Sequence, residues 1–303
     1  MSEYEFKTID LKFREQPQAI AVYAFPHPDG VALVESGPGS TTENLKRGLN
    51  EIGFSVHDVT HVLLTHIHLD HAGAAGWLAK HGAEVFVHQI GSPHLLDPSR
   101  LLASARRIYK DQMDKLWGDF LPVPEKQLTA LEDGDIIQVG KLEFQAIDTP
   151  GHAYHHHAYL WNQVCFTGDV GAVRIPGLGK PHLRLPMPPP EFHPDKWRTS
   201  IERLKKEKIQ TLVPTHFGIY QDVNWHLDQI LRELDAAESW MREIMPRNLP
   251  LEDLRTEFIR WTTDRSNQLG IDPEAINTFE KAKPSGMSAD GIKRYWDRYL
   301  NED

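Results

Sequence analysis

The sequence contains one cysteine, fewer basic than acidic residues, and no long apolar run. Cys165 alone cannot form an intrachain disulfide, and it excludes a cysteine-rich zinc or iron–sulfur site. Lys and Arg number 33 against 43 Asp and Glu, a net charge of −10 that disfavours non-specific binding to nucleic acid. The longest uncharged stretch, 149–168, is rich in His and Tyr and does not resemble a membrane span.

These deficits favour a soluble, cytoplasmic globular protein with no nucleic-acid or membrane partner. The N-terminal residues carry acids and lack an apolar segment, so no signal peptide is expected. A chain of 303 residues can form one large domain or two modest ones. The residue type present in unusual number is histidine, with 17 copies.

Strand and helix patterns alternate up to residue 220, and only helical patterns follow. We therefore expect a catalytic α/β domain over 1–220, with a helical insertion at about 91–125, and an α-helical unit over 221–303 that covers the cleft. Ser99–Trp117 is predicted as one amphipathic helix, and Gly171–Pro194 as a long binding loop or lid. Strands are predicted at 18–25, 31–35, 59–65, 84–88, 135–139, 142–148, 157–161, 164–167 and 209–213. Helices are predicted at 42–52, 74–81, 195–206, 224–245, 251–268, 273–282 and 288–300.

The apolar strand 59–65 runs directly into the motif His-x-His-x-Asp-His. Because alternate residues of an extended segment point the same way, His66 and His68 can face one point. Asp70 and His71 can then turn toward a second point nearby. Imidazole and carboxylate groups suit zinc, iron or manganese, and a site with few protein ligands leaves room for water.

Three further candidate ligands each follow a predicted strand. His152 lies in Asp-Thr-Pro-Gly-His, Asp169 in Thr-Gly-Asp, and His216 in Val-Pro-Thr-His. A rigid sheet can hold such loop residues together at one site. In this order behind His-x-His-x-Asp-His, the three segments favour a metal site over separate structural roles.

Taken together, these segments resemble the metallo-β-lactamase superfamily. The matching pieces are THIHLDHAG (Thr65–Gly73), DTPGH (Asp148–His152), TGD (Thr167–Asp169) and PTHFG (Pro214–Gly218). The resemblance implies a four-layer αββα sandwich with a C-terminal helical unit like that of the glyoxalase II-like branch. It also implies two divalent metal ions, with zinc preferred and iron or manganese as alternatives. The implied ligands are His66, His68 and His152 on one ion and Asp70, His71 and His216 on the other, with Asp169 bridging.

Such a centre would supply a metal-bridging hydroxide that attacks an ester or thioester, so a hydrolase is expected. Asp70 is the candidate catalytic residue, orienting the hydroxide or handing a proton to the leaving group. Three alternatives stay open. They are a phosphodiesterase of the same fold, a sulfur dioxygenase-type oxidoreductase with a single iron, and a metal-binding protein without catalytic activity.

At three positions the sequence departs from patterns found within the superfamily, and these departures bear on the metal surroundings and on which branch is expected. Glu35-Ser36-Gly37 stands where many members carry Asp-Thr-Gly, so a contact beside the metals is altered. His68 stands where flavin-linked di-iron relatives carry an acid. Ala172 replaces a tyrosine that many acyl-homoserine lactonases place three residues after the bridging aspartate.

Candidate substrate-binding residues are His88, Arg174 and Tyr220. A group of basic side chains in or beside the long loop could engage a carboxylate or phosphate of the substrate. Its members are Arg174, Lys180, His182 and Arg184. Apolar faces on the helices 99–117 and 224–245 make a homodimer plausible.

Overall fold

The computed structural model describes residues 5–174, 180–282 and 284–300, and it comprises two compact units. The first unit contains the chain up to Asp148 together with His155–Gly168. The second contains Thr149–Tyr154 and the chain from Asp169 onward. The predicted division at residue 220 and the predicted insertion stay predictions.

The first unit contains a sheet whose strands follow the chain order β1-β2-β3-β4-β5-β6. β1, β2 and β3 pair antiparallel, whereas β3, β4, β5 and β6 run parallel. The carboxyl ends of the parallel strands therefore share one edge of the sheet, the edge at which α/β proteins place functional residues. The strands are β1 Lys7–Asp10, β2 Ala21–His27, β3 Gly30–Val34, β4 Val59–Leu63, β5 Glu84–His88 and β6 Leu128–Leu131.

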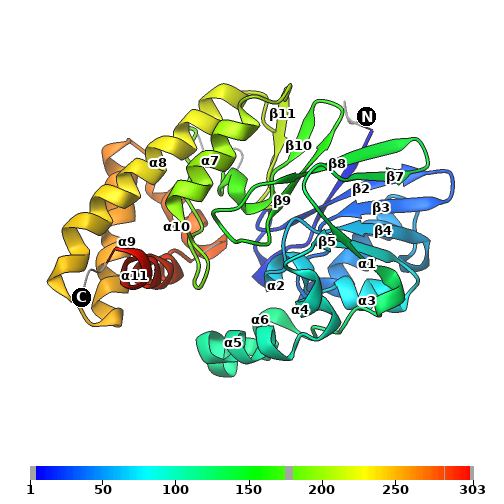
Figure 1. Ribbon diagram of the computed structural model, residues 1–303, viewed down its shortest axis with the longest axis horizontal. Coiled ribbons are helices and arrows are strands. Elements are labelled where there is room, and N and C mark those ends of the chain that lie inside the picture. The colour runs from blue at the N-terminus through cyan, green and yellow to red at the C-terminus, as the bar shows by residue number, and fades with distance from the viewer. Residues whose placement is uncertain (1–4, 175–179, 283, 301–303) are drawn as a thin grey trace. The chain divides into compact units, whose positions relative to one another are not determined.

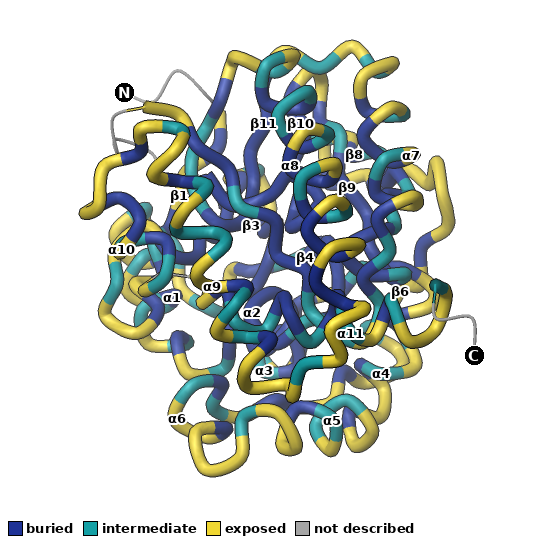
Figure 2. Tube along the Cα trace, turned by 90° about the vertical axis from the view of Figure 1, so that its left-hand side faces the viewer, coloured by how far each residue is buried: buried dark blue, intermediate teal, exposed yellow. Residues whose placement is uncertain are grey.

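A second sheet in this unit has the antiparallel order β10-β9-β8-β7. Aromatic side chains from the two sheets pack against one another, with the Phe25 and Phe144 rings 4.9 Å apart and the Tyr23 and Phe166 rings 5.3 Å apart. β3 and β4 are accordingly drawn as buried along most of their length in Figure 2. The strands are β7 Ile136–Val139, β8 Leu142–Asp148, β9 His157–Trp161 and β10 Val164–Phe166.

Helices α1 and α3 pack on the first sheet, α1 on β1 and α3 on β4 and β5. The prediction of one helix over Ser99–Trp117 was wrong. Lys110 has a φ of 49°, which no right-handed helix accommodates, and it separates two shorter helices. The helices are α1 Thr42–Glu51, α2 Leu69–Ala72, α3 Ala75–Lys80, α4 Ser92–Leu96, α5 Ser99–Tyr109 and α6 Met113–Trp117.

The second unit is mainly helical, and α8 forms its longest element (Figure 1). Ion pairs join neighbouring helices, since Arg198 on α7 contacts Asp235 and Glu238 on α8. Among the described residues, none of the helices is both long and apolar enough to cross a membrane. Part of the predicted loop Gly171–Pro194 lies outside the described residues. The elements are α7 Pro194–Leu204, β11 Thr211–Val213, α8 Val223–Ile244, α9 Leu251–Gln268, α10 Pro273–Ala282 and α11 Gly286–Tyr299.

Candidate metal centre

In the first unit, the candidate ligands and the buried Glu35 follow the carboxyl ends of two adjacent parallel strands. Glu35 follows β3, and the His-x-His-x-Asp-His motif follows β4. Because β3 and β4 are hydrogen-bonded neighbours, the residues after their ends come together. α2 begins at Leu69, so Asp70 and His71 lie in its only turn while His66 and His68 precede it.

Glu35 and Thr65 hold His71 in a defined orientation. The Nδ1 of His71 lies 2.9 Å from Oε1 of Glu35, and the hydroxyl of Thr65 donates to the same oxygen at 2.6 Å. All three residues are fully buried. Since a carboxylate only accepts hydrogen bonds, Nδ1 of His71 carries the proton and Nε2 carries the lone pair.

The two histidines at alternate positions converge. Nε2 of His66 lies 2.9 Å from Nδ1 of His68, and the His66 and His71 rings are 3.9 Å apart between centroids. A carboxylate oxygen of Asp70 lies 3.8 Å from Nε2 of His71. Four potential ligands of one short segment therefore lie close together within the first unit.

In the second unit, Asp169 stands between two histidines. Its Oδ2 lies 3.3 Å from Nε2 of His152, and its Oδ1 lies 3.2 Å from Nε2 of His216. All three side chains are buried. Each carboxylate oxygen thus faces a different imidazole, an arrangement in which one aspartate could serve two neighbouring ions.

The position of His152 depends on the preceding residue, Gly151, whose backbone lies close to that of Trp197. Gly151 has a φ of 144°, and a side chain there would meet the backbone of Trp197 at 2.3 Å. Nδ1 of His152 lies 2.8 Å from the carbonyl oxygen of Pro186. A carbonyl accepts and cannot donate, so Nδ1 of His152 carries the proton and Nε2 faces Asp169 with its lone pair.

These protonation patterns are those that metal binding requires. A histidine that binds a metal through one ring nitrogen almost always donates the other N–H to a carboxylate or carbonyl. His71 and His152 both do so, with Glu35 and Pro186 as acceptors. Neutral imidazoles and carboxylates form a donor set that suits zinc, iron or manganese. The residues present therefore fit a divalent metal ion.

A third cluster, formed by His88, Asp148 and His157 in the first unit, has a different chemistry. Oδ1 of Asp148 lies 3.0 Å from Nε2 of His88 and 2.7 Å from Nε2 of His157. The amide of Ile90 donates to Nδ1 of His88, so Nε2 of His88 must keep its proton. Burial alone would raise the pKa of Asp148, but the contacts with His157 and His88 outweigh it and lower that pKa. An ionised carboxylate bridging two neutral imidazoles accounts for the cluster without a metal ion.

Arg174 and Tyr220, expected near a substrate, contact each other in the second unit. The guanidinium of Arg174 forms a bidentate pair with Asp222 and stacks 4.0 Å from the Tyr220 ring. The Tyr220 hydroxyl donates to the carbonyl of Arg174 and lies 3.2 Å from that of Phe217. These contacts link the segment after Asp169 to the segment after His216. Roles for Arg174, Tyr220 and His88 toward a substrate stay predictions.

The sequence profile of the Metallo-beta-lactamase superfamily matches residues 15–216 of this chain. The chain belongs to this superfamily. The predicted fold class is therefore confirmed, with a mixed α/β core of two sheets and a C-terminal helical region. Membership indicates a metal-dependent hydrolase, and the structure contains groups of His and Asp side chains that could hold a metal ion.

Several relatives are similar at low identity. The metallo-beta-lactamase fold-containing protein ST1585 of Sulfurisphaera tokodaii is 24% identical, over 72% of this chain and 80% of its own length. An atrochrysone carboxyl ACP thioesterase of Aspergillus fumigatus is 24% identical over 80% of this chain and 62% of its own. The hydroxyacylglutathione hydrolase GloC of Haemophilus influenzae is 29% identical over 44% and 58%. The chain thus spans only about three fifths of the two hydrolases.

A solved structure extends the likeness along nearly the whole chain. The metallo-beta-lactamase family protein TTHA1429 of Thermus thermophilus superposes with a TM-score of 0.63 at 19% identity. The match covers 96% of this chain and 92% of that one. At this identity the likeness shows the fold, and it includes the C-terminal helices.

Proposed function

We propose that this protein is a dinuclear metal-dependent hydrolase that cleaves a small-molecule ester or thioester, as glyoxalase II-like proteins do. The observation that carries the proposal is Asp169, whose two carboxylate oxygens each face a different histidine. The proposed ligands of one ion are His66, His68 and His152. Those of the other are Asp70, His71 and His216, with Asp169 shared. Zinc is the proposed metal.

Two divalent ions held by such a set would lower the pKa of a bound water and polarise the acyl oxygen of the substrate. The chain supplies the orientation, because Glu35 fixes the tautomer of His71 and the Pro186 carbonyl fixes that of His152. Asp70 is 7% exposed and is the proposed group that orients the attacking water or hands a proton to the leaving group. Cys165 lies buried in β10, so it is not proposed as a nucleophile.

The names of two relatives support the proposal that the cleaved bond is an ester or thioester. One is a thioesterase and the other a hydroxyacylglutathione hydrolase, and they are similar to this chain over 80% and 44% of its length, respectively. The net charge of −10 favours a small substrate over a nucleic acid. A cytoplasmic location and a homodimer are kept as proposals.

The test combines elemental analysis with a substrate screen. We expect about two zinc ions per chain in protein purified without chelator, and hydrolysis of thioesters or esters in preference to bis(p-nitrophenyl) phosphate. His66→Ala and Asp169→Ala should each lose both metal and activity, while His57→Ala, at an exposed position, should keep both. Full metal content in His66→Ala would defeat the ligand assignment. A single iron with oxygen consumption on a persulfide would establish the dioxygenase alternative instead.

A further inference from the structure

The orientation of His152 depends on a segment that is distant in the sequence. Its Nδ1 donates to the carbonyl oxygen of Pro186 at 2.8 Å, and the imidazole is fully buried. Both residues belong to the second unit. The direction of the His152 ring therefore depends on what fixes the backbone at Pro186.

Before Pro186, the segment is anchored by side-chain contacts with α9 and α10. His182 lies 3.1 Å from the hydroxyl of Ser266 on α9, and the guanidinium of Arg184 contacts Glu280 on α10. His182 and Arg184 are two of the basic residues considered for an anionic substrate group. In the structure they contact the chain itself and help to hold this segment in place.

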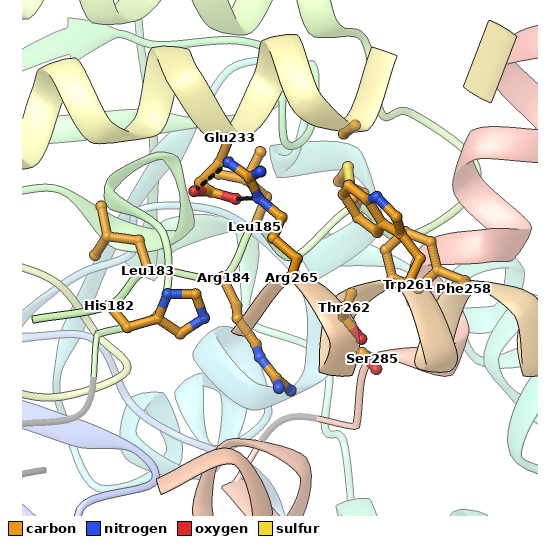
Figure 3. Close-up of a pocket in the computed structure, with 12 residues that line it drawn as sticks. His182, Leu183, Arg184, Leu185, Glu233, Phe258, Trp261, Thr262, Arg265 and Ser285 are labelled. Atoms are coloured by element: carbon orange, nitrogen blue, oxygen red, sulfur yellow. Dashed lines mark hydrogen bonds and ion pairs between the residues drawn. The ribbon is translucent and has the colours of Figure 1, made fainter. Parts of the chain in front are cut away.

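A small cavity adjoins the segment on both sides of Pro186. Leu185 and Met187 both line it, together with side chains of α8 and α9 such as Glu233 and Phe258 (Figure 3). The cavity volume is about 30 Å³, which is room for water and little else. Because this space adjoins both neighbours of Pro186, packing against α8 and α9 does not by itself fix the Pro186 carbonyl.

After Pro186, the segment passes directly against α11. The amide of Met187 donates to the hydroxyl of Ser288 at 3.2 Å, and both residues are buried. Gly291 lies about one turn further along the helix. A methyl group there would be 2.1 Å from the carbonyl oxygen of Met187 and 2.8 Å from the carbonyl carbon of Pro188. The backbone of α11 therefore contacts the backbone of the segment with no side chain between them.

Gly291 is unfavourable for α11 taken alone. Glycine weakens the interior of a helix relative to alanine, because its backbone loses more freedom on folding. Position 291 is buried and lies inside α11, which spans Gly286–Tyr299. The close approach to Met187 supplies the reason for a glycine here, because an alanine would push the segment and the helix apart.

α11 is itself anchored, and it also contacts the chain on the other side of His152. Arg255 on α9 forms a bidentate pair with Asp290 of α11. The Tyr299 hydroxyl lies 2.8 Å from that of Tyr154, which is two residues after His152. One helix thus contacts both the segment that accepts the hydrogen bond of His152 and the segment that carries His152.

We propose that α11 positions His152 as a metal ligand, with Gly291 and Ser288 as the positioning residues. Ser288 fixes the amide of Met187, and the contact at Gly291 sets how closely the segment approaches the helix. Together they keep the Pro186 carbonyl on Nδ1 of His152, so that His152 presents Nε2 as the metal ligand. The proposal rests on the proposed function only for the role of His152 as a ligand.

The first measurement reads the position of His152 directly by NMR in protein labelled with ¹⁵N-histidine. The Nδ1 proton should exchange slowly with solvent, with or without bound metal, because it is buried and hydrogen-bonded. His152→Gln identifies the signal. Gly291→Ala should abolish it, and Ser288→Ala should speed its exchange roughly fivefold. The Nε2 proton of His226, donated to Gly171 in the same unit, should stay unchanged as an internal reference.

The second measurement is zinc affinity, determined by competition with a coloured chelator. Gly291→Ala should weaken the binding of one ion by about tenfold or more, because it displaces a group that orients the ligand His152. Gly286→Ala, at the first residue of α11, is the matched control. A methyl group there would lie 3.6 Å from Ile259, an ordinary contact. This variant should bind zinc as the unaltered protein does.

Ser288→Ala keeps the proposal testable if Gly291→Ala does not fold. It removes one hydroxyl and creates no overlap, and its effect on zinc affinity should be smaller, roughly threefold. Its matched control is Ser239→Ala, at an exposed position on α8, which should change neither the His152 signal nor the zinc affinity. Urea unfolding identifies conditions in which each variant that is compared is folded.

Contrary results are distinct for the two proposals. An unchanged His152 signal in Gly291→Ala or in Ser288→Ala would overturn the role of α11, whatever the metal content. Equal changes at His152 and His226 would overturn it too, because they would show a general loss of structure. Absence of metal from the unaltered protein would contradict the proposed function instead, and the exchange of the His152 proton would still decide the role of α11.

Discussion

The Nδ1 of His71 lies 2.9 Å from a carboxylate oxygen of Glu35, a residue that has a φ of 73° and is fully buried. A left-handed backbone at a non-glycine residue costs on the order of 1 kcal/mol or more, and such strain is typical of functional sites. The contact explains how a glutamate can serve at the position where the resemblance to the superfamily leads us to expect aspartate. Its longer side chain still delivers an acceptor to Nδ1 of His71 and to the hydroxyl of Thr65.

The first prediction concerns this acceptor. Glu35→Gln replaces one carboxylate oxygen with an amide that can donate, which disturbs the tautomer of His71. We expect metal affinity to fall about 10- to 100-fold, with loss of close to one ion per chain by elemental analysis. The matched control is Glu43→Gln on the exposed side of α1, which should bind metal normally. Normal metal content in Glu35→Gln would show that Glu35 does not orient His71.

The second prediction concerns Tyr220, whose hydroxyl links the carbonyls of Arg174 and Phe217. Tyr220→Phe removes the link and keeps the ring that stacks on Arg174. We expect the free energy of unfolding in urea to fall by about 1 kcal/mol. Activity should fall as well, because the segments that carry Asp169 and His216 lose a connection. Tyr299→Phe, which removes a hydroxyl contact with Tyr154 nearer the surface, serves as the control. The idea fails if both variants behave alike.

The third prediction concerns pH and His226. Burial lowers its pKa to about 4, and the Arg174 guanidinium beside Nδ1 acts in the same direction. The unfolded chain takes up this proton near pH 6.5 and the folded chain only near pH 4. Stability is therefore complete above pH 6.5 and is lost as the pH falls toward 4, by on the order of 3 kcal/mol.

His226→Gln isolates this contribution, since the amide can still donate to the carbonyl of Gly171 as Nε2 of His226 does. Urea unfolding at pH 7.5, 6.0 and 4.5 should show a shallower loss of stability for the variant. His57→Gln, at an exposed position, should follow the unaltered protein. Parallel curves for His226→Gln and the unaltered protein would exclude His226 as the source.

The fourth prediction concerns Gly151. A methyl group at this position would overlap the backbone of Trp197 at 2.3 Å, and the φ of 144° disfavours any other residue. Gly151→Ala should therefore destabilise the protein by about 2 kcal/mol or more and displace His152. Gly53→Ala, which has a φ of 89° but nothing within 4 Å, separates backbone strain from steric overlap. Equal losses of stability in the two variants would rule out the overlap with Trp197.

Local pattern was sufficient for most of the fold. The strands ending at His88 and Asp148 were predicted to the residue, because each is a compact apolar or β-branched run that ends at polar residues. β1 and β6 were missed, since Lys7–Asp10 carries a charged residue at each end and Leu128–Leu131 contains only one β-branched residue. The break at Lys110 was missed as well, because no glycine or proline marks it.

The surroundings of the candidate site could not be read from the sequence. The motif residues were visible, but the hydrogen bond from His152 to Pro186 joins positions 34 residues apart through a backbone carbonyl. Likewise, nothing in the sequence indicates that Asp222 forms an ion pair with Arg174, because this pairing depends on tertiary packing. Side-chain types can be listed from a sequence, whereas their hydrogen-bond partners require coordinates.

The amide of Ile90 fixes the tautomer of His88. By donating to one ring nitrogen, it keeps the proton on the other, so a histidine within reach of a carboxylate and a second histidine is withheld from metal. This discrimination against metal binding at His88 requires neither a steric barrier nor a charged residue. It depends only on the direction of one backbone N–H. The chain has 17 histidines. Backbone contacts of this kind would reduce metal binding at histidines whose neighbours donate hydrogen bonds. Metal ions would then bind preferentially to histidines whose neighbours accept them.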